Sequence, residues 1–482
     1  MSTATGYAPA VSEERGGKRR STLRRAGAGL GLVTLALAIG SGIWSVRVLL
    51  PRATGYAAKI ACSAAYVSGR PADDIEAQEL AAVGFVDLAF DDSAGRVSAS
   101  VWGLAERSAA HRGPIGCVLE QDGLALAGEL GQTERSTNLA ARDPAQPWPL
   151  GDGEDPRPDP AGLDRAALDA AIEATFAPEL GTRAVLVVHR GRLLAERYAE
   201  GFGPSTPLPG WSMAKSVTNA LVGILVGEGR LAIDEPAPVP EWRADADDPR
   251  AAITLDQLLR MSSGLAWEER YGPLGAGSDM LFVDESCASL AVAQPLEATP
   301  GSVFEYSSGS ANIVARIIRD QFPDRASQLR FFAEALLGPL GLTTAVLELD
   351  PSGTFIGSSF ALMSGRDWAR LGQLYLDDGV WQGRRILPEG WVAYSRTPAR
   401  AAARGEYGAL FQTNAGAPDD PSDRRLPQVP TDAFEMVGYE GQSVLIVPSR
   451  GLVLVRLGLT RAPAVWDEDA FAAAVLAALP PA

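Results

Sequence analysis

The sequence predicts a mixed α/β fold in which an antiparallel sheet is flanked by helices. Two apolar hairpin patterns support this prediction, one over residues 182–201 and one over residues 443–458. Helical patterns fill the residues between them, so hairpins from both ends of one domain are expected to pair in a single sheet. A third observation is the apolar segment 26–46, which predicts one transmembrane helix ahead of that domain.

The N-terminal segment resembles a membrane anchor in length and charge. Residues 26–46 are 21 positions without a charged side chain, and residues 1–25 before them are basic. The positive-inside rule then places residues 1–25 in the cytoplasm and the bulk of the protein outside. We therefore expect a single-pass protein of the bacterial inner (cytoplasmic) membrane, facing the periplasmic or extracellular side; the alternative is a cleaved signal peptide.

The charge of the remaining chain argues against a nucleic-acid partner. Residues 1–52 hold eight basic and two acidic side chains, so the rest carries 35 positive and 57 negative charges, a net of −22. Such a surface repels phosphate backbones. The charge either keeps the protein soluble or attracts a cationic substrate.

Cysteine and histidine are scarce. Cys62 and Cys117 either form a disulfide in an oxidising compartment or remain free thiols, and Cys287 is left unpaired. The chain has two histidines and no C-x-x-C motif, so no metal and no cofactor are predicted.

Composition divides the chain after the anchor into three parts. Residues 55–133 contain a short helix pattern, a hairpin and a further strand, which predicts a small α+β module. Residues 134–160 contain six prolines and are expected to be an extended linker. Residues 161–482 form the larger domain, which opens with an amphipathic helix.

The segment GWSMAKSVTNALVGILVGEGRL, residues 210–231, contains one of only three lysines in a chain with 40 arginines. A lysine amine can release its proton when burial or a neighbouring charge lowers its pKa, whereas arginine keeps its proton. Where a positive surface charge is enough, this composition uses arginine. The retention of Lys215 therefore predicts a role in proton transfer.

Ser212 precedes Lys215 by three residues, at the start of a predicted buried helix that ends near Gly227. This spacing places the hydroxyl and the amine on one helix face, and the helix N-terminus favours an anionic intermediate. The pattern predicts a serine nucleophile with a nitrogen base. The alternative is a helix cap at Ser212 and a surface charge at Lys215. A Ser-His-Asp triad would have to use His111 or His189, which lie in the module and at a hairpin turn.

Five segments in order resemble the serine hydrolases related to class C β-lactamases, particularly the branch with 6-aminohexanoate-dimer hydrolases and family VIII esterases. The resemblance covers about residues 160–480, and its segments are GWSMAKSV, LLRMSSGL, PGSVFEYSSGSANIVARII, GRDWARLGQLYLDDGVWQGRRILPEGW and GYEGQSVLIVPSRGLVLVRLG. It implies a β-lactamase-like antiparallel sheet with flanking helices and a helical subdomain.

The resemblance also implies roles for single residues. Ser212 is expected to be acylated, with Lys215 as its base and Tyr306, from the family motif Y-x-N, passing a proton to the leaving group. Ser308 stands where the motif has asparagine, so a contact with a substrate amide through this position is altered.

The third family motif, K-T-G, corresponds to Tyr439-Glu440-Gly441. The lysine that would hold a substrate carboxylate is absent, and Glu440 would repel one. Tyr439 and Gly441 are expected beside the substrate, although Gly441 also fits a simple turn. The backbone N–H groups of Ser212 and Gln442 are expected to form the oxyanion hole.

A few other residues near these motifs are assigned from their type. Trp267, Tyr271 and Tyr407 either line an acyl pocket or belong to the core or its rim. The residues MSSGL, 261–265, are expected to shape a turn.

We therefore expect a serine hydrolase that acts through an acyl-enzyme on an ester or small-amide substrate. The alternatives are a D-stereospecific amidase or peptidase, an enzyme of the penicillin-binding type, and an inactive homologue that binds a cell-wall peptide or a partner protein.

Overall fold

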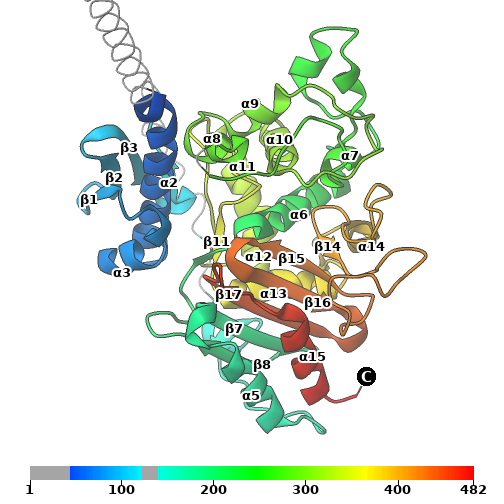
Figure 1. The fold of residues 1–482 in the computed structure, drawn as a ribbon. Coiled ribbons are helices and arrows are strands. Elements are labelled where there is room, and N and C mark those ends of the chain that lie inside the picture. The colour runs from blue at the N-terminus through cyan, green and yellow to red at the C-terminus, as the bar shows by residue number, and fades with distance from the viewer. Residues whose placement is uncertain (1–43, 122–138, 140–141, 273, 482) are drawn as a thin grey trace, which may run out of the picture.

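The computed structural model describes residues 44–121, 139, 142–272 and 274–481. They form a small N-terminal module beside a larger domain (Figure 1). The larger domain contains a six-stranded antiparallel sheet in the order β14-β15-β16-β17-β7-β8. Its strands are β7 (Thr182–His189), β8 (Arg192–Tyr198), β14 (Gln412–Thr413), β15 (Phe434–Gly438), β16 (Gln442–Val447) and β17 (Leu452–Gly458).

The first and last hairpins of the larger domain meet in this sheet. Strand β7 pairs with β8 on one side and with β17 on the other, and Val187 lies opposite Leu454. The mixed α/β fold predicted from the two hairpins is therefore confirmed. The sheet joins residues more than 250 positions apart, so the fold depends on long-range pairing.

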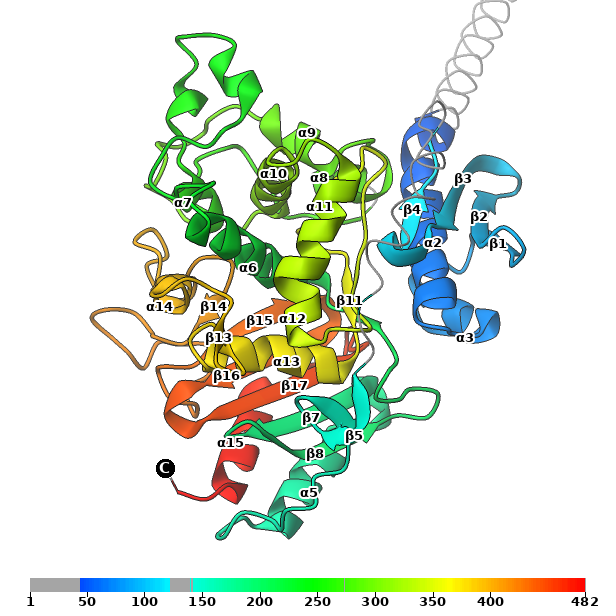
Figure 2. The same ribbon diagram turned by 180° about the vertical axis from the view of Figure 1, so that it is seen from behind.

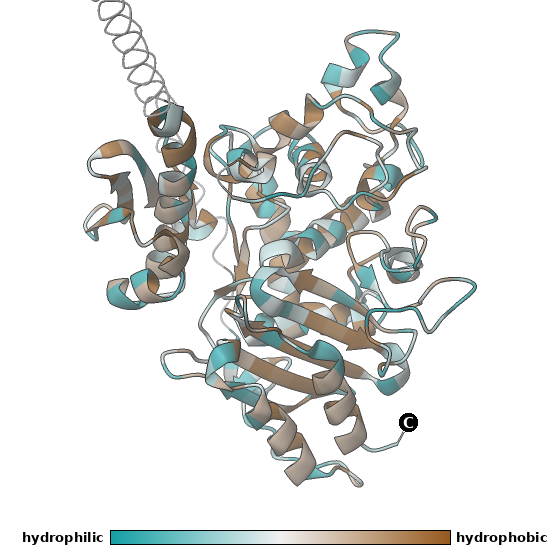
Figure 3. Ribbon diagram, in the orientation of Figure 1, coloured by the Kyte–Doolittle hydropathy of each residue, from teal (hydrophilic) through white to brown (hydrophobic). Residues whose placement is uncertain are grey.

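Helices cover both faces of the sheet. Helices α5 (Arg165–Ala174) and α15 (Glu468–Ala478) lie on one face (Figure 1), and α13 (Gly365–Leu376) lies on the other (Figure 2). Every residue of β7 is buried, and alternate side chains join the two cores. Burial on both faces explains why the central strands are apolar along their length (Figure 3).

The other helices of the larger domain lie above or beside the sheet and include those of the predicted helical subdomain (Figure 1). They are α6 (Ala214–Gly227), α7 (Leu255–Leu259), α8 (Ala276–Phe282), α9 (Cys287–Val292), α10 (Ser308–Arg319), α11 (Arg325–Phe331), α12 (Gly338–Leu340) and α14 (Trp391–Arg396). The short strands are β9 (Leu208–Pro209), β10 (Val346–Leu347), β11 (Ala361–Met363), β12 (Val380–Trp381) and β13 (Arg384–Arg385).

The N-terminal module packs one long helix against a four-stranded sheet. Helix α2 (Leu50–Cys62) follows a π-helical turn at Ser45–Leu49 and runs into another at Ser63–Val67. The sheet order is β1-β2-β3-β4, and Asp91 pairs with Arg96, so the hairpin turn lies where the sequence places it. The other elements are α3 (Ala72–Ala77), β1 (Asp87–Asp91), β2 (Arg96–Val101), β3 (Leu104–His111) and β4 (Cys117–Leu119).

The structure contradicts two predictions, the transmembrane helix and the membrane localisation that depends on it. In the part of the chain that the structure describes, no helix has both the length and the apolar character needed to span a bilayer. Residues 1–25 and 26–43 lie outside the described residues. Helix α2, which continues the turn at Ser45–Leu49, is buried against protein from Thr54 onward, and its Arg52 forms an ion pair with Asp279 at 2.6 Å. The hydropathy of a segment measures how apolar its side chains are, but it does not show whether they are buried in protein or in lipid.

Part of the predicted linker is bound to the larger domain. Strands β5 (Asp143–Pro147) and β6 (Gly151–Gly153) pair in parallel, and Arg370 of α13 donates hydrogen bonds to the carbonyls of Pro149 and Gly151 at 2.9 and 2.7 Å. This segment therefore runs over the surface of α13.

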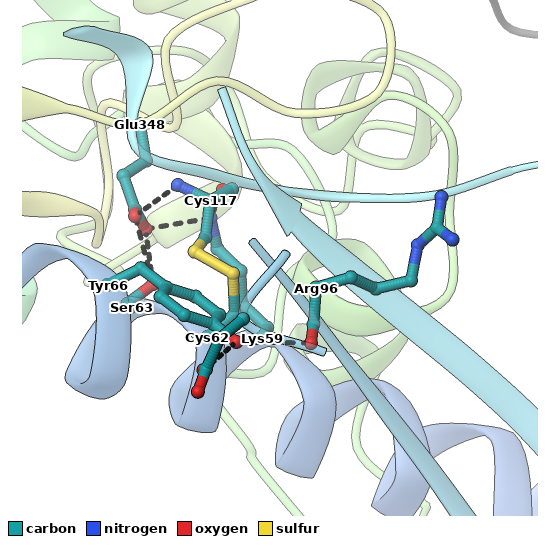
Figure 4. Close-up of a disulfide and its surroundings, with 8 residues drawn as sticks. Lys59, Cys62, Ser63, Tyr66, Arg96, Cys117 and Glu348 are labelled. Atoms are coloured by element: carbon teal, nitrogen blue, oxygen red, sulfur yellow. Dashed lines mark hydrogen bonds and ion pairs between the residues drawn. A yellow bond between two sulfur atoms is a disulfide. The ribbon is translucent and has the colours of Figure 1, made fainter. Parts of the chain in front are cut away.

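The module is joined to the larger domain by a buried ion pair. Lys59 Nζ lies 2.7 Å from a carboxylate oxygen of Glu348, and both side chains are at most 1% exposed. The same carboxylate accepts hydrogen bonds from the Ser63 hydroxyl and the Cys117 N–H (Figure 4). Gly55 allows close approach, because a Cβ there would lie 2.2 Å from the Phe282 carbonyl oxygen. The contact is therefore polar at its centre and tightly packed.

Cys62 and Cys117 form a disulfide between α2 and β4, with their Cα atoms 5.9 Å apart. Cys287 is a buried free thiol that donates to the Met280 carbonyl at 3.0 Å, and burial raises its pKa well above the usual value. Of the two arrangements that the sequence allows, the structure has the disulfide.

Thiol labelling should count one free cysteine. Denatured, unreduced protein is expected to react once, at Cys287, and the folded protein is expected to react far more slowly because a buried thiol with a raised pKa supplies little thiolate. Mass spectrometry after alkylation measures both results. Three alkylated cysteines in the unreduced sample would show that the disulfide does not form.

Candidate active site

The nucleophile candidate lies in a strained turn. A 3-10 turn at Trp211–Met213 leads into α6, and Trp211 has a φ of +49°, which is uncommon for a bulky residue. Gly210 precedes it, and a Cβ there would lie 2.3 Å from the Trp368 ring. Ser212 is half-buried at the start of the helix. Helix α6 is buried from Ala214 to Leu225 and ends at Gly227, as the sequence predicts.

Lys215 is enclosed and donates to three oxygens. Its Nζ lies 3.1 Å from Ser212 Oγ, 2.9 Å from Ser308 Oγ and 3.0 Å from the Ser358 carbonyl oxygen. The residue is 1% exposed. Three donors and three acceptors match the full capacity of an ammonium group. The alternative of an ordinary surface charge at Lys215 does not hold.

Tyr306 faces the same amine. Lys215 Nζ lies 4.8 Å from the centroid of the Tyr306 ring, and this ring packs edge-on against Tyr407 at 5.7 Å. The structure thus brings Ser212, Lys215 and Tyr306 together, although they come from a turn, a helix and the loop before α10. Tyr407 lies beneath the site as a packed aromatic residue.

Ser308 connects Lys215 to a carboxylate that the sequence analysis did not identify. Its hydroxyl donates to Glu269 Oε1 at 2.5 Å, and its N–H donates to Glu269 Oε2 at 2.8 Å. The Trp267 indole N–H and the Tyr271 hydroxyl also donate to Glu269, at 2.6 and 2.9 Å. Glu269 therefore accepts four hydrogen bonds, and the Ser308 hydroxyl bridges its carboxylate and the Lys215 amine.

Tyr271 is 45% exposed overall, yet its hydroxyl points into the site, where its single proton is shared between Ser308 Oγ and Glu269 Oε1, each 2.9 Å away. Burial of this hydroxyl and the nearby Glu269 carboxylate raise the pKa of Tyr271 well above 10.0. Trp267 and Tyr271 thus border the site as proposed from their type. Glu269 lies between them in sequence, and proximity to these aromatic residues was the one available signal.

The turn between β15 and β16 carries the other predicted residues. Tyr439 is 64% exposed, and its ring meets that of Trp211 edge-on at 5.7 Å, so it stands at the rim. Gly441 has a φ of +80°, and a Cβ there would lie 2.5 Å from Arg456 Nη1, which explains the glycine by the turn itself. The Gln442 side chain points away from Ser212, bonding the Gly458 carbonyl at 2.6 Å.

The Glu440 side chain is turned away from the substrate side. It is 6% exposed and bonds the Trp211 indole N–H at 3.2 Å and Arg461 Nε at 2.5 Å. Burial raises the pKa of Glu440, and the Arg461 guanidinium partly offsets this rise. Repulsion of a substrate carboxylate is therefore expected from Glu269, which lies in the site, more than from Glu440.

No group of three or more His, Cys, Asp or Glu side chains that could bind a metal occurs among the described residues. His111 lies in β3 of the module, and His189 ends β7, where it pairs with Arg192. The polar contacts around Ser212 come from Lys215 and its neighbours.

Residues 168–478 match the model of the family described as Beta-lactamase. The chain belongs to the beta-lactamase family. The 6-aminohexanoate-dimer hydrolase of Paenarthrobacter ureafaciens is 27% identical over 284 residues, which cover 55% of this chain and 67% of that protein. The resemblance inferred from the five motif segments is confirmed.

Solved structures agree with the beta-lactamase family fold. A putative 6-aminohexanoate-dimer hydrolase from Bacillus anthracis superposes with a TM-score of 0.52 at 22% identity, covering 73% of this chain and 95% of that one. A penicillin-binding protein homologue from Caulobacter crescentus gives a TM-score of 0.50 at 20% identity, covering 66% and 98%. As a member of this family the protein is a serine hydrolase, and it acts through an acyl-enzyme on an ester or small amide.

Proposed function

We propose that Ser212 is the nucleophile of an esterase or small-amide hydrolase, with Lys215 as its base and Tyr306 as the proton donor to the leaving group. The observation that carries the proposal is the enclosed Lys215 amine 3.1 Å from Ser212 Oγ. A side chain that serves as a general base must be able to lose its proton, which a lysine amine can do and an arginine guanidinium cannot.

The first step of the proposed acylation uses two groups already in hydrogen-bond contact, Ser212 Oγ and Lys215 Nζ. Lys215 acts as a base after its ammonium has released one proton: the neutral amine then accepts the Ser212 proton as Oγ bonds to the substrate carbonyl carbon, and the carbonyl oxygen becomes an oxyanion. Backbone N–H groups of Ser212 and of the β15–β16 turn stabilise that charge, with Gln442 as the predicted second donor. Tyr306 protonates the departing alcohol or amine and becomes a phenolate. Water then attacks the acyl-enzyme and gives one proton back to Tyr306, and Lys215 returns its proton to Ser212 Oγ as the acid is released.

Charge in the site bears on substrate choice. The Glu269 carboxylate is linked to the Lys215 amine through the Ser308 hydroxyl, which contacts both. Ser308 also stands where the Y-x-N motif has asparagine, so the amide side chain is absent. Tyr439 occupies the position of the K-T-G lysine, so no lysine is available there to bind a substrate carboxylate. These features favour neutral or cationic substrates over penicillins and peptides that present a carboxylate.

A substrate panel tests this function. Purified protein is expected to hydrolyse p-nitrophenyl esters and aminohexanoate oligomers, and to act on nitrocefin at least about tenfold more slowly, since about 1.4 kcal/mol of charge repulsion has that effect. D-amino acid amides in the same panel test the alternative of a D-stereospecific amidase or peptidase. Equal turnover of nitrocefin would contradict the proposed preference, and no turnover of any substrate by folded protein would favour the inactive binding homologue.

A further inference from the structure

We propose that the N-terminal module positions the Trp211–Ser212 turn of the larger domain, through a line of contacts from the Gln78 and Glu79 carbonyls to Arg461, Glu440 and Trp211. This inference rests on the proposed role of Ser212. It assigns a part in the reaction to a module that carries no candidate nucleophile of its own.

The line begins at Trp211, the residue before the nucleophile. Its left-handed backbone conformation must be maintained by contacts, because a side chain of this size rarely adopts it. The indole N–H donates to Glu440 Oε2 at 3.2 Å, and the ring lies between those of Phe360 and Tyr439, at 5.8 and 5.7 Å. A shift of this ring would move the Ser212 backbone with it.

Glu440 holds the indole and is itself fixed at both ends. Its backbone φ is +62°, again in the left-handed region, and its carbonyl accepts hydrogen bonds from the Thr460 N–H and from Arg456 Nη1, both at 3.0 Å. Its second carboxylate oxygen accepts from Arg461 Nε at 2.5 Å. The carboxylate therefore transmits the position of Arg461 to Trp211.

Arg461 reaches from the larger domain into the module. Its Nη1 donates to the Gln78 carbonyl at 2.7 Å and its Nη2 to the Glu79 carbonyl at 2.9 Å. The Glu79 side chain is bound in turn by Arg183 at 2.7 Å. The planar Arg461 guanidinium thus binds the module backbone and the Glu440 carboxylate at the same time, in a fixed relative geometry.

A second contact between the two parts ends at the same indole. Lys59 of the module lies 4.6 Å from the centroid of the Phe360 ring, which packs on Trp211. Two residues before Phe360, the Ser358 carbonyl accepts the hydrogen bond from Lys215. The module therefore supports both the turn that carries Ser212 and the segment that orients Lys215.

The test replaces Arg461 and measures the chemical step. In Arg461→Gln, kcat and the rate of fluorophosphonate labelling at Ser212 are expected to fall by about 10- to 100-fold, since small misplacements of reacting groups have effects of this size. KM is expected to stay within about twofold, because the substrate pocket is not touched. Arg450→Gln is the matched control: Arg450 also donates to two backbone carbonyls, those of Leu476 and Pro480, but it precedes β17, at the opposite end of that strand from Arg461.

Trp211→Phe is the second variant, because it retains an aromatic ring at this position, smaller than the indole, and removes the N–H that binds Glu440. It is expected to lower kcat in the same direction, and it decides the matter if Arg461→Gln does not fold. Wild-type kcat and labelling rate in folded Arg461→Gln or in Trp211→Phe would overturn the inference. Absence of labelling in the wild-type protein would instead overturn the proposed role of Ser212.

Discussion

Lys215→Arg is expected to abolish covalent labelling of Ser212 by a fluorophosphonate and to lower esterase activity by about 10²- to 10⁴-fold, the usual contribution of a general base. Arginine keeps the positive charge but cannot accept the Ser212 proton. The structure strengthens this expectation, because Lys215 Nζ is 3.1 Å from Ser212 Oγ and the residue is 1% exposed. Labelling detected on a gel, together with ester turnover, measures the effect.

Two serine variants of the same region provide controls for this experiment. Ser212→Ala should lose labelling completely, which shows that the probe reacts there. Ser216→Ala should retain it, although Ser216 is also buried in α6 and donates to the Leu410 carbonyl at 2.8 Å. Circular dichroism confirms that each variant is folded. Wild-type labelling and activity in folded Lys215→Arg would refute the proposed mechanism.

Glu348→Ala is expected to destabilise the protein by about 3–5 kcal/mol, the typical effect of removing one partner of a buried ion pair. The variant leaves the Lys59 charge without its carboxylate, and it also removes the acceptor of the Ser63 hydroxyl and the Cys117 N–H. Urea denaturation, followed by fluorescence and by circular dichroism, measures the loss.

The controls separate the burial of the pair from its charge. Asp423→Ala breaks an exposed pair with Arg404 and should leave the unfolding midpoint unchanged. The double variant Lys59→Met with Glu348→Leu should recover part of the stability, because no unpaired charge remains, but not all of it, because the Cys117 N–H still lacks an acceptor. A wild-type midpoint for Glu348→Ala would mean that the module is not held through this ion pair.

Much of the candidate site followed from the sequence because its first parts are local. Ser212 and Lys215 are three residues apart, in the 3-10 turn that leads into α6 and in the first turn of α6, so local helical geometry places their side chains together. Tyr306 and Ser308 needed the resemblance, since no spacing relates them to residues almost a hundred positions earlier. Glu269 was missed because it lies in a loop without periodicity. Its two hydrogen bonds from Ser308 form only when α10 packs beside that loop, whereas those from Trp267 and Tyr271 come from the loop itself.

The sequence by itself determined the two hairpins that pair in the central sheet, the buried helix that carries Ser212 and Lys215, and the family, because hydrophobic periodicity and motif spacing are local properties of the chain. Only the tertiary structure decided that Glu440 forms an ion pair with Arg461 and that Lys59 is buried against Glu348. It alone also showed that Arg461 links the module to the Trp211–Ser212 turn through Glu440. The transmembrane prediction likewise rested on a local apolar run, and the described residues contain no helix long and apolar enough to span a membrane. Contacts between residues hundreds of positions apart depend on how whole elements pack, and no local pattern encodes them.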